Sequence, residues 1–569
     1  MCTLPYVRDS VSPTSTRSLV VGIGPVRTCE TNMWFLLIEH FVFVLVLSIL
    51  LSIFVNKGTE ELLRVILLGI KSLPGVSGLL VNVLRNEATN FIKQVNLGSN
   101  DGSKPIKVVI PEKGIEPKVL LKEMEEMRKA EVNHIDGKIF AYTYTLEDDH
   151  LEMQKDCFKL FQEKIGYSVD HDELVKQFQM AFLHENALNP MLYPSLRKME
   201  TEIVSMTANM LNGDEETAGF LTSGGTESVL MAVKTYRDRA QKLFPTIKNP
   251  EIVAPTTIHP VMDKAAAYFG LRVIHVPVDS DLRADVEAME RAITPNTILL
   301  AASAPQFCHG IVDPIEALST VAVKRSIPLH VDACFGGFML PWVEKLGYPV
   351  PKWDFRCPGV TSISADVHKY GFTVKGASVI AYRNSDLRKY QIFTYAEWPG
   401  GLYGSPSLAG TRPGGNIAAA WASMKGLGME GYLKKAKELM ELTEKMKEGV
   451  RKTDGICIMG NPVMTCFAVG SADDQVDILA VADAMETRGW RIERTQKPNS
   501  FHCSILPHHK YSADAFTTDL DSSVKECRNN KSLSKKGTAG MYGMMASVPD
   551  KAIINDFIKE FFSEVYKVQ

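Results

Sequence analysis

A lysine lies within a short segment that reads Ser-Ile-Ser-Ala-Asp-Val-His-Lys-Tyr over residues 362–370. This lysine is Lys369, and an amine is a side-chain nucleophile that condenses reversibly with an aldehyde. A second segment, Pro-Leu-His-Val-Asp-Ala-Cys over residues 328–334, has the composition of a buried strand and ends near the carboxylate of Asp332. A third, Leu-Thr-Ser-Gly-Gly-Thr-Glu-Ser over residues 221–228, is typical of a turn that opens a helix. The three together indicate a site for a phosphorylated aldehyde.

Pyridoxal phosphate (PLP) is a cofactor that needs a lysine amine, a carboxylate and a turn that opens a helix. Its aldehyde bonds a lysine, and its ring accepts electrons well when an acid keeps the ring nitrogen protonated. Backbone N–H groups at the start of a helix bind its phosphate. We therefore predict PLP on Lys369, with Asp332 at the ring nitrogen. The residues predicted to cradle the phosphate are Ser223, Gly224, Gly225 and Thr226.

Three histidines lie close to these segments. His259 follows a predicted strand, so we expect its ring to stack on the cofactor. His330 precedes Asp332 on the same predicted strand and is assigned to cofactor binding, while His368 is given a supporting role beside Lys369. Each feature alone has an ordinary structural explanation, such as a helix cap or a solvated surface residue. Their combination favours a cofactor enzyme.

The composition excludes several other classes of protein. The chain has 569 residues, of which 45% are hydrophobic and 23% charged, as in an ordinary folded protein. The net charge is −3 and no basic stripe interleaved with aromatic residues is present, so we expect no nucleic acid as a partner. The 10 cysteines are scattered, without C-x-x-C pairs or zinc-type spacing. This indicates reduced thiols in a cytosol-facing body and no metal site.

One segment departs from the soluble pattern. Residues 33–55 read MWFLLIEHFVFVLVLSILLSIFV, which at about 1.5 Å per residue would span the roughly 30 Å hydrocarbon layer. Glu39 and His40 interrupt the run, and basic residues on its two sides balance, so the charges do not orient it. A cleaved signal peptide and a buried core helix are the alternative interpretations. We predict a transmembrane helix.

The remaining chain divides by its patterns. From about residue 186 to 415, short apolar runs alternate with helical stretches, which predicts an α/β domain with a mostly parallel sheet. After residue 426 the pattern is that of a smaller α+β domain. The predicted division is 1–32 tail, 33–55 transmembrane helix, 56–134 juxtamembrane helices and linker, 135–200 first part of the catalytic body, 201–425 large PLP-binding domain, and 426–569 C-terminal small domain.

Several motifs resemble those of one known family. They are Ser223-Gly224-Gly225-Thr226-Glu227-Ser228, Ala304-Pro305-Gln306-Phe307-x-His309-Gly310, His330-Val331-Asp332-Ala333, Ser364-Ala365-Asp366-x-His368-Lys369-Tyr370-Gly371, Lys375-Gly376 and Gly410-Thr411-Arg412-Pro413-Gly414-Gly415. The chain resembles the sphingosine-1-phosphate lyases, PLP enzymes of fold type I (aspartate aminotransferase-like) within the group II decarboxylase-like superfamily. The resemblance runs from about Ile135 to Gly543 and includes the N-terminal span.

This resemblance implies retro-aldol cleavage between C2 and C3 of a phosphorylated sphingoid base, giving a long-chain fatty aldehyde and phosphoethanolamine. By resemblance, Lys369 carries PLP, and Tyr144 and Lys375 approach the substrate phosphate or the C3 hydroxyl. Tyr403 would reach into the site of the neighbouring subunit. The family implies a homodimer with shared active sites. It also implies a single-pass protein of the endoplasmic reticulum membrane with its catalytic domain in the cytosol.

One position departs from the family pattern. Asn189 stands where the family has a histidine that contacts phosphate. An uncharged amide loses a charged hydrogen bond worth roughly 1.5–3 kcal/mol, and His184 lies near enough in sequence to compensate. Two alternative functions stay open, and Asn189 motivates the second of them. One is a PLP-dependent decarboxylase of aromatic or acidic amino acids, and the other is a membrane-tethered pseudoenzyme.

Overall fold

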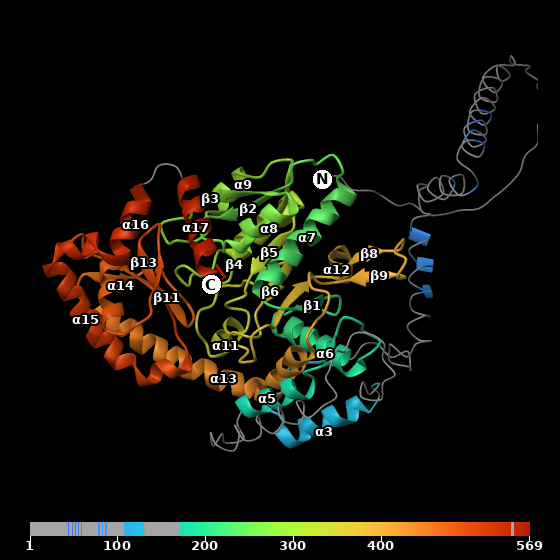
Figure 1. The fold of residues 1–569 in the computed structure, drawn as a ribbon, viewed down its shortest axis with the longest axis horizontal. Coiled ribbons are helices and arrows are strands. Elements are labelled where there is room, and N and C mark those ends of the chain that lie inside the picture. Colours follow the sequence, from blue (N-terminus) through green and yellow to red (C-terminus); the bar gives the residue numbers. More distant parts are fainter. Residues whose placement is uncertain are drawn as a thin grey trace, which may run out of the picture. The chain divides into compact units, whose positions relative to one another are not determined.

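The structure is a computed structural model that describes residues 107–129, 131, 171–547 and 551–568, together with scattered positions between 44 and 87. Tyr144 lies outside the described residues, as does most of the segment 33–55 predicted to cross a membrane. Within the described part of the chain, no helix combines the length and the apolar character that a membrane crossing requires. The described residues from 107 onward form the body that carries the predicted site (Figure 1).

A seven-stranded sheet lies at the centre of this body, in the order β1-β7-β6-β5-β4-β2-β3. Its strands are β1 (Ala218–Thr222), β2 (Glu251–Pro255), β3 (Arg272–Val276), β4 (Thr297–Ser303), β5 (Leu329–Asp332), β6 (Val360–Ala365) and β7 (Ser378–Tyr382). All neighbours pair in parallel except those of β7, which runs against β6 and β1. The predicted α/β class with a mostly parallel sheet is confirmed.

Helices cover both faces of the sheet, because alternate residues of each strand point to opposite sides. Ile252 and Ala254 of β2 pack with the helices α7 (Gly225–Leu243) and α8 (Val261–Phe269). Val253, between them, belongs to the larger core cluster on the other face. That core includes residues of α6 (Pro194–Met210), α10 (Ile315–Arg325), α11 (Leu340–Lys345) and α13 (Gly414–Lys452). Further helices in this part are α3 (Pro117–Arg128), α5 (His171–Ala181), α9 (Val286–Arg291) and α12 (Ser385–Arg388).

The C-terminal part contains a second, antiparallel sheet in the order β10-β11-β13-β12. Its strands are β10 (Ile456–Ile458), β11 (Cys466–Ser471), β12 (Glu493–Thr495) and β13 (Ser500–Ser504), and its helices are α14 (Ile478–Thr487), α15 (Ala513–Asn529), α16 (Gly537–Ser547) and α17 (Lys551–Val565). The predicted boundary at 425/426 falls inside α13, just before a kink at Gly428, whose φ is 62°. This position favours glycine because a positive φ is costly for other residues.

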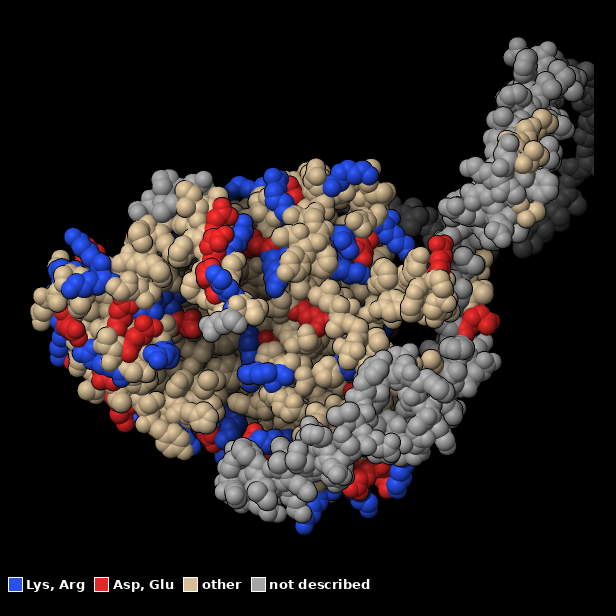
Figure 2. Space-filling view, viewed as in Figure 1, with Lys and Arg blue, Asp and Glu red and all other residues tan. Residues whose placement is uncertain are grey.

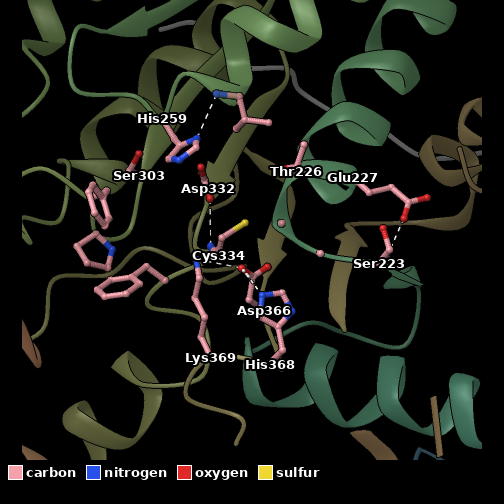
Figure 3. A pocket seen from close by; sticks show the side chains of 16 residues that line it. Ser223, Thr226, Glu227, His259, Ser303, Asp332, Cys334, Asp366, His368 and Lys369 are labelled. Carbon is pink, nitrogen blue, oxygen red and sulfur yellow. Dashed lines mark hydrogen bonds and ion pairs between the residues drawn. The ribbon is translucent and has the colours of Figure 1, made fainter. Parts of the chain in front are cut away.

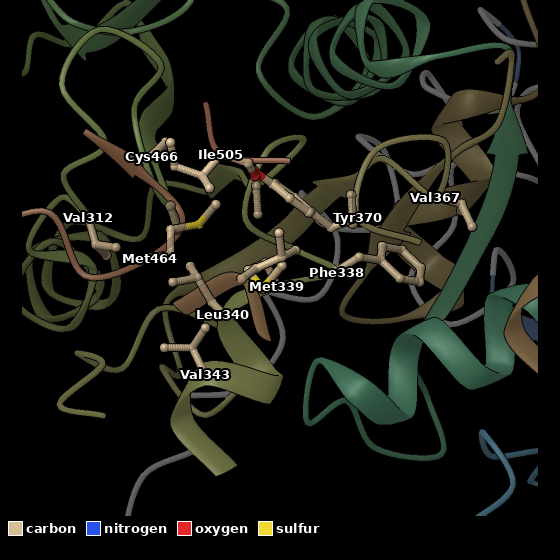
Figure 4. Packing of buried hydrophobic residues seen from close by; sticks show 14 of the residues in the cluster. Val312, Phe338, Met339, Leu340, Val343, Val367, Tyr370, Met464, Cys466 and Ile505 are labelled. Atoms are coloured by element: carbon tan, nitrogen blue, oxygen red, sulfur yellow. The ribbon is translucent and has the colours of Figure 1, made fainter. Parts of the chain in front are cut away.

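The two sheets share one buried core. Figure 4 shows Met339 and Leu340, which follow β5, packed with Met464 and Cys466 of the C-terminal part. Tyr370 joins this cluster and donates a hydrogen bond from its hydroxyl to the carbonyl of Ile505, at 3.2 Å. The segment that carries Lys369 is therefore held by both parts of the body. On the surface, Figure 2 shows basic and acidic side chains interspersed over the visible face of the described residues.

Candidate active site

A cavity of about 430 Å³ opens at the carboxyl ends of the central strands. Ligands of open α/β sheets bind at this edge, where loops from separate strands meet. The lining residues are Ser223, Gly224, Gly225, Thr226, Glu227, His259, Val261, Ser303, Pro305, Phe307, Asp332, Cys334, Phe335, Asp366, His368 and Lys369. Figure 3 shows Ser223 and Thr226 on one side of this cavity and Ser303 on the other.

Lys369 lies in the turn that follows β6. Its Nζ is 3.0 Å from Oδ2 of Asp366, whose side chain is only 3% exposed. Burial alone would lower the pKa of Lys369. The attraction of nearby negative groups, above all the carboxylate of Asp366, outweighs the effect of burial and raises the pKa above its ordinary value. Asp366 therefore holds the amine in its protonated form, which is not nucleophilic.

This ion pair predicts a pH dependence for cofactor loading. In Asp366→Asn the pKa of Lys369 falls, because burial remains while the attraction is lost. Since the free amine is the reactive form, the rising limb of the loading rate should move to lower pH. Adding PLP to the apoprotein at a series of pH values and following the visible absorbance measures this rate. Asp366→Glu is the matched control, and an unshifted profile in Asp366→Asn would show that the pair does not govern the amine.

Asp332 is the last residue of β5 and is 8% exposed. Its Oδ1 accepts hydrogen bonds from the backbone N–H of Cys334, at 3.1 Å, and from the hydroxyl of Ser364, at 3.3 Å. These two donors fix the carboxylate at the cavity wall. Its other oxygen takes no part in these two bonds.

His330 does not line the cavity. It is fully buried two residues before Asp332, on the same face of β5. Its Nδ1 lies 2.8 Å from the hydroxyl of Ser362, and its Nε2 lies 3.4 Å from that of Ser364. Burial lowers the pKa of His330 to about 4, so the ring is neutral at neutral pH. His330 thus supports Asp332 through Ser364 and has no direct access to the cavity.

The turn between β1 and α7 forms the predicted phosphate cradle. A Cβ on Gly225 would lie 2.7 Å from Sγ of Cys334 and 2.9 Å from both carboxylate oxygens of Asp366, so only glycine fits there. The carboxylate of Glu227 braces the turn by accepting from the N–H groups of Ser223, at 2.7 Å, and Leu408, at 3.0 Å. The backbone at the start of α7 is therefore held open toward the cavity.

These residues fit PLP. The cavity brings together a lysine amine, a fixed carboxylate at a strand end and a helix start with exposed hydroxyls at Ser223 and Thr226. A helix of 19 residues supplies the positive end of its dipole to an anion at this point. The donor set thus matches the aldehyde, the ring nitrogen and the phosphate of the cofactor.

Two further predicted residues line the cavity: His259, expected to stack on the cofactor, and His368, expected to support Lys369. His259 is exposed toward it, with Nδ1 accepting from the N–H of Val261 at 3.1 Å. His368 is half-buried, and its Nδ1 accepts from the N–H of Ala377 at 3.2 Å. Burial lowers the pKa of His368, so its ring is neutral at neutral pH. Both histidines can offer a ring face to a bound aromatic group.

Three other residues singled out in the sequence are absent from the cavity lining. Lys375 is exposed, and its ammonium group donates to the carbonyl of His368 at 3.2 Å. Tyr403 lies on β9 (Tyr403–Ser405), which pairs with β8 (Phe393–Tyr395), and is 37% exposed. The side chain of Asn189 accepts from the N–H of Met191 at 3.0 Å and is absent from the lining. The roles expected for Lys375 and Tyr403 stay predictions.

Sequence reasoning gave no role to several residues of this site. Asp366 had a usable signal, because it stands three residues before Lys369 in the same turn. Glu227 had a weaker one, as an acid in the first turn of a helix. Phe307 stands in one of the family motifs without a role assigned to it, and Phe335 carried no signal, since isolated aromatic residues in loops are common.

Residues 154–469 match the family model described as the pyridoxal-dependent decarboxylase conserved domain. The sphingosine-1-phosphate lyase of Dictyostelium discoideum is 39% identical over 515 residues, covering 89% of this chain and 92% of the relative. Sphingosine-1-phosphate lyase 1 of Rattus norvegicus is 44% identical over 397 residues, covering 69% of each. The chain belongs to the sphingosine-1-phosphate lyase family.

Solved structures agree with this membership. The sphingosine-1-phosphate lyase of Burkholderia pseudomallei superposes with a TM-score of 0.61 at 36% identity, covering 74% of this chain and 100% of that one. Glutamate decarboxylase of Lactobacillus brevis gives a TM-score of 0.56 at 19% identity, which is a likeness of fold alone. The cavity around Lys369 is therefore the candidate active site of this chain.

Proposed function

We propose that this chain cleaves phosphorylated long-chain bases between C2 and C3, releasing a long-chain fatty aldehyde and phosphoethanolamine. Membership of the sphingosine-1-phosphate lyase family supports this activity. The single observation that carries it is the juxtaposition of Lys369, Asp332 and the Gly224–Gly225 turn in one cavity. These are the groups that PLP chemistry on an amine substrate needs.

Each part of the cofactor has a partner among these residues. Lys369 would hold it covalently, Asp332 would pair with its ring nitrogen, His259 would support its ring, and the turn at the start of α7 would bind its phosphate. When bound, PLP supplies an electron sink that stabilises the carbanion left at C2.

The chain itself moves protons and fixes orientation. Asp366 lies 3.0 Å from Lys369 and holds its amine in place at the cavity wall. When it is not bonded to the cofactor, Lys369 would be a base within the same cavity. Asp332 is held by two donors, so its carboxylate does not have to reorganise during the reaction.

The experiment that tests this proposal uses the full chain loaded with PLP. It is incubated with a phosphorylated long-chain base, and fatty aldehyde and phosphoethanolamine are quantified. Release of CO₂ from aromatic and acidic amino acids is measured in parallel. Aldehyde and phosphoethanolamine in equal amounts support the lyase. CO₂ without aldehyde would establish a decarboxylase, and bound cofactor without either product would establish a pseudoenzyme.

We further propose a fold type I homodimer anchored in the endoplasmic reticulum membrane by a single helix over residues 33–55, with its catalytic domain in the cytosol. The apolar run of the sequence supports the anchor. Exposed apolar side chains on the β8–β9 hairpin support a second copy as the partner. They are Phe393, Tyr395, Trp398 and Leu402, of which Leu402 is 89% exposed. Mass measurement of the detergent-solubilised chain tests the dimer, and Leu402→Asp should weaken it.

A further inference from the structure

The cavity around Lys369 has one strongly apolar side. The rings of Phe307 and Phe335 form it, and we call these two residues the aromatic wall. Their centroids are 6.3 Å apart and the rings meet edge to face at 76°. Phe307 is 40% exposed, and Phe335 is partly buried. The remaining lining is mostly hydroxyl, carboxylate, imidazole or glycine, with Pro305 and Val261 as smaller apolar contributions.

The aromatic wall is supported from the C-terminal sheet. His502 of β13 stacks on Phe307, with centroids 4.3 Å apart and an angle of 21°, and meets Phe335 edge-on at 6.1 Å. His502 is 6% exposed, and its Nε2 lies 2.5 Å from the hydroxyl of Ser504. Burial lowers the pKa of His502 to about 4, so an uncharged ring backs the wall at neutral pH. The wall is thus a fixed surface rather than a pair of loose side chains.

The aromatic wall lies next to the reacting amine. Nζ of Lys369 is 5.4 Å from the ring centroid of Phe335. The amine of the substrate must reach the cofactor carbon that Lys369 would bind. C2 of the substrate, which bears the amine, and C3, the next carbon of the chain, therefore come within a few bonds of Nζ of Lys369. The large apolar surface beside that position is the ring of Phe335, continued by Phe307. The phosphate cradle is polar and cannot compete for hydrocarbon.

We propose that the aromatic wall binds the first methylenes of the hydrocarbon chain of the substrate and sets the chain-length dependence of cleavage. This inference rests on the proposed function. Removing a methylene from water changes binding by about fourfold, so kcat/KM should rise by about that factor for each methylene that reaches the wall. Once the chain extends past Phe307, further methylenes should add little.

The test measures kcat/KM of the full chain for phosphorylated 2-amino-1,3-diols whose chains grow by two methylenes at a time. In Phe307→Ala the rise with chain length should become shallower, and the ratio of kcat/KM between long and short substrates should fall by about tenfold. Phe335→Leu keeps apolar volume and should retain more of the rise than Phe335→Ala. Phe244, 47% exposed at the end of α7 and outside the cavity, gives the matched control Phe244→Ala, which should keep the wild-type ratio.

A binding readout separates the wall from the chemistry. Phosphorylated long-chain alcohols without an amine cannot react, so their inhibition constants report binding alone. The dependence of these constants on chain length should flatten in Phe307→Ala as the kinetic dependence does. Cleavage with an unchanged length dependence in Phe307→Ala and Phe335→Ala would overturn this inference and leave the proposed function intact. Failure of the wild type to cleave any member of the series would instead remove the proposed function.

Discussion

Lys369→Ala should lose turnover by at least about a thousandfold, because it removes both the covalent attachment of the cofactor and a positioned base, and a base alone contributes roughly 10²–10⁴-fold. The visible absorbance that depends on the bond between lysine and cofactor should disappear with it. Both losses follow from a single amine, the Nζ that lies 3.0 Å from Asp366 in the cavity. Product formation by the purified, PLP-treated variant and its absorbance spectrum measure them together.

The same variant should remain folded. The substitution leaves the nearly buried Asp366 without its ionic partner, which lowers the free energy of unfolding by about 1–3 kcal/mol. The typical total stability of a protein is about 5–15 kcal/mol. Thermal unfolding followed by circular dichroism checks this. Lys389, which pairs with Asp386 on the surface and is 52% exposed, provides the control Lys389→Ala with wild-type activity. Turnover within tenfold of wild type in a folded Lys369→Ala would show that another residue carries the cofactor.

Most strands of the central sheet could be predicted from local composition. Glu251–Ala254 and Leu329–Val331 are short, mainly apolar segments between turn signals, and the structure has β2 and β5 there. The reversed direction of β7 could not be predicted in this way, because its apolar run reads the same whichever way it runs. The reason lies in the connection. Residues 366–377 between β6 and β7 contain no helix to carry a parallel crossover, so the chain turns back.

Some residues of the site could also be predicted from local sequence, and others could not. Lys369 and Asp332 could be predicted because Asp332 ends one strand and Lys369 lies in the turn after the neighbouring strand, so strand prediction places them at the same edge of the sheet. The support of the aromatic wall depends on contacts between distant segments, since Phe307 meets His502 from the other sheet. The brace from Glu227 to the N–H of Leu408 spans 181 positions of the chain. Such pairs are set by tertiary packing and leave no local pattern.

Asp332→Asn should lower kcat by about 10²–10³-fold, the typical effect of removing one preorganised electrostatic partner from an active site. Asparagine keeps the size and the acceptor oxygen that binds the N–H of Cys334 and the hydroxyl of Ser364. It loses the negative charge that favours a protonated ring nitrogen. The fold and the binding of PLP should therefore survive while the ring loses its capacity to accept electrons. Steady-state kinetics together with titration of bound PLP distinguish these effects.

Two further variants decide whether charge or support is responsible. Ser364→Ala removes one donor to Asp332 and one neighbour of His330, and it should lower kcat by less than Asp332→Asn because the charge remains. His330→Asn leaves Asp332 in place and should lower kcat by about the same factor as Ser364→Ala. A loss in Ser364→Ala as large as that in Asp332→Asn would mean that placement of the carboxylate matters more than its charge. Full activity in Asp332→Asn would mean that cleavage does not use the electron sink, and Asp332 would then be a structural residue at the end of β5.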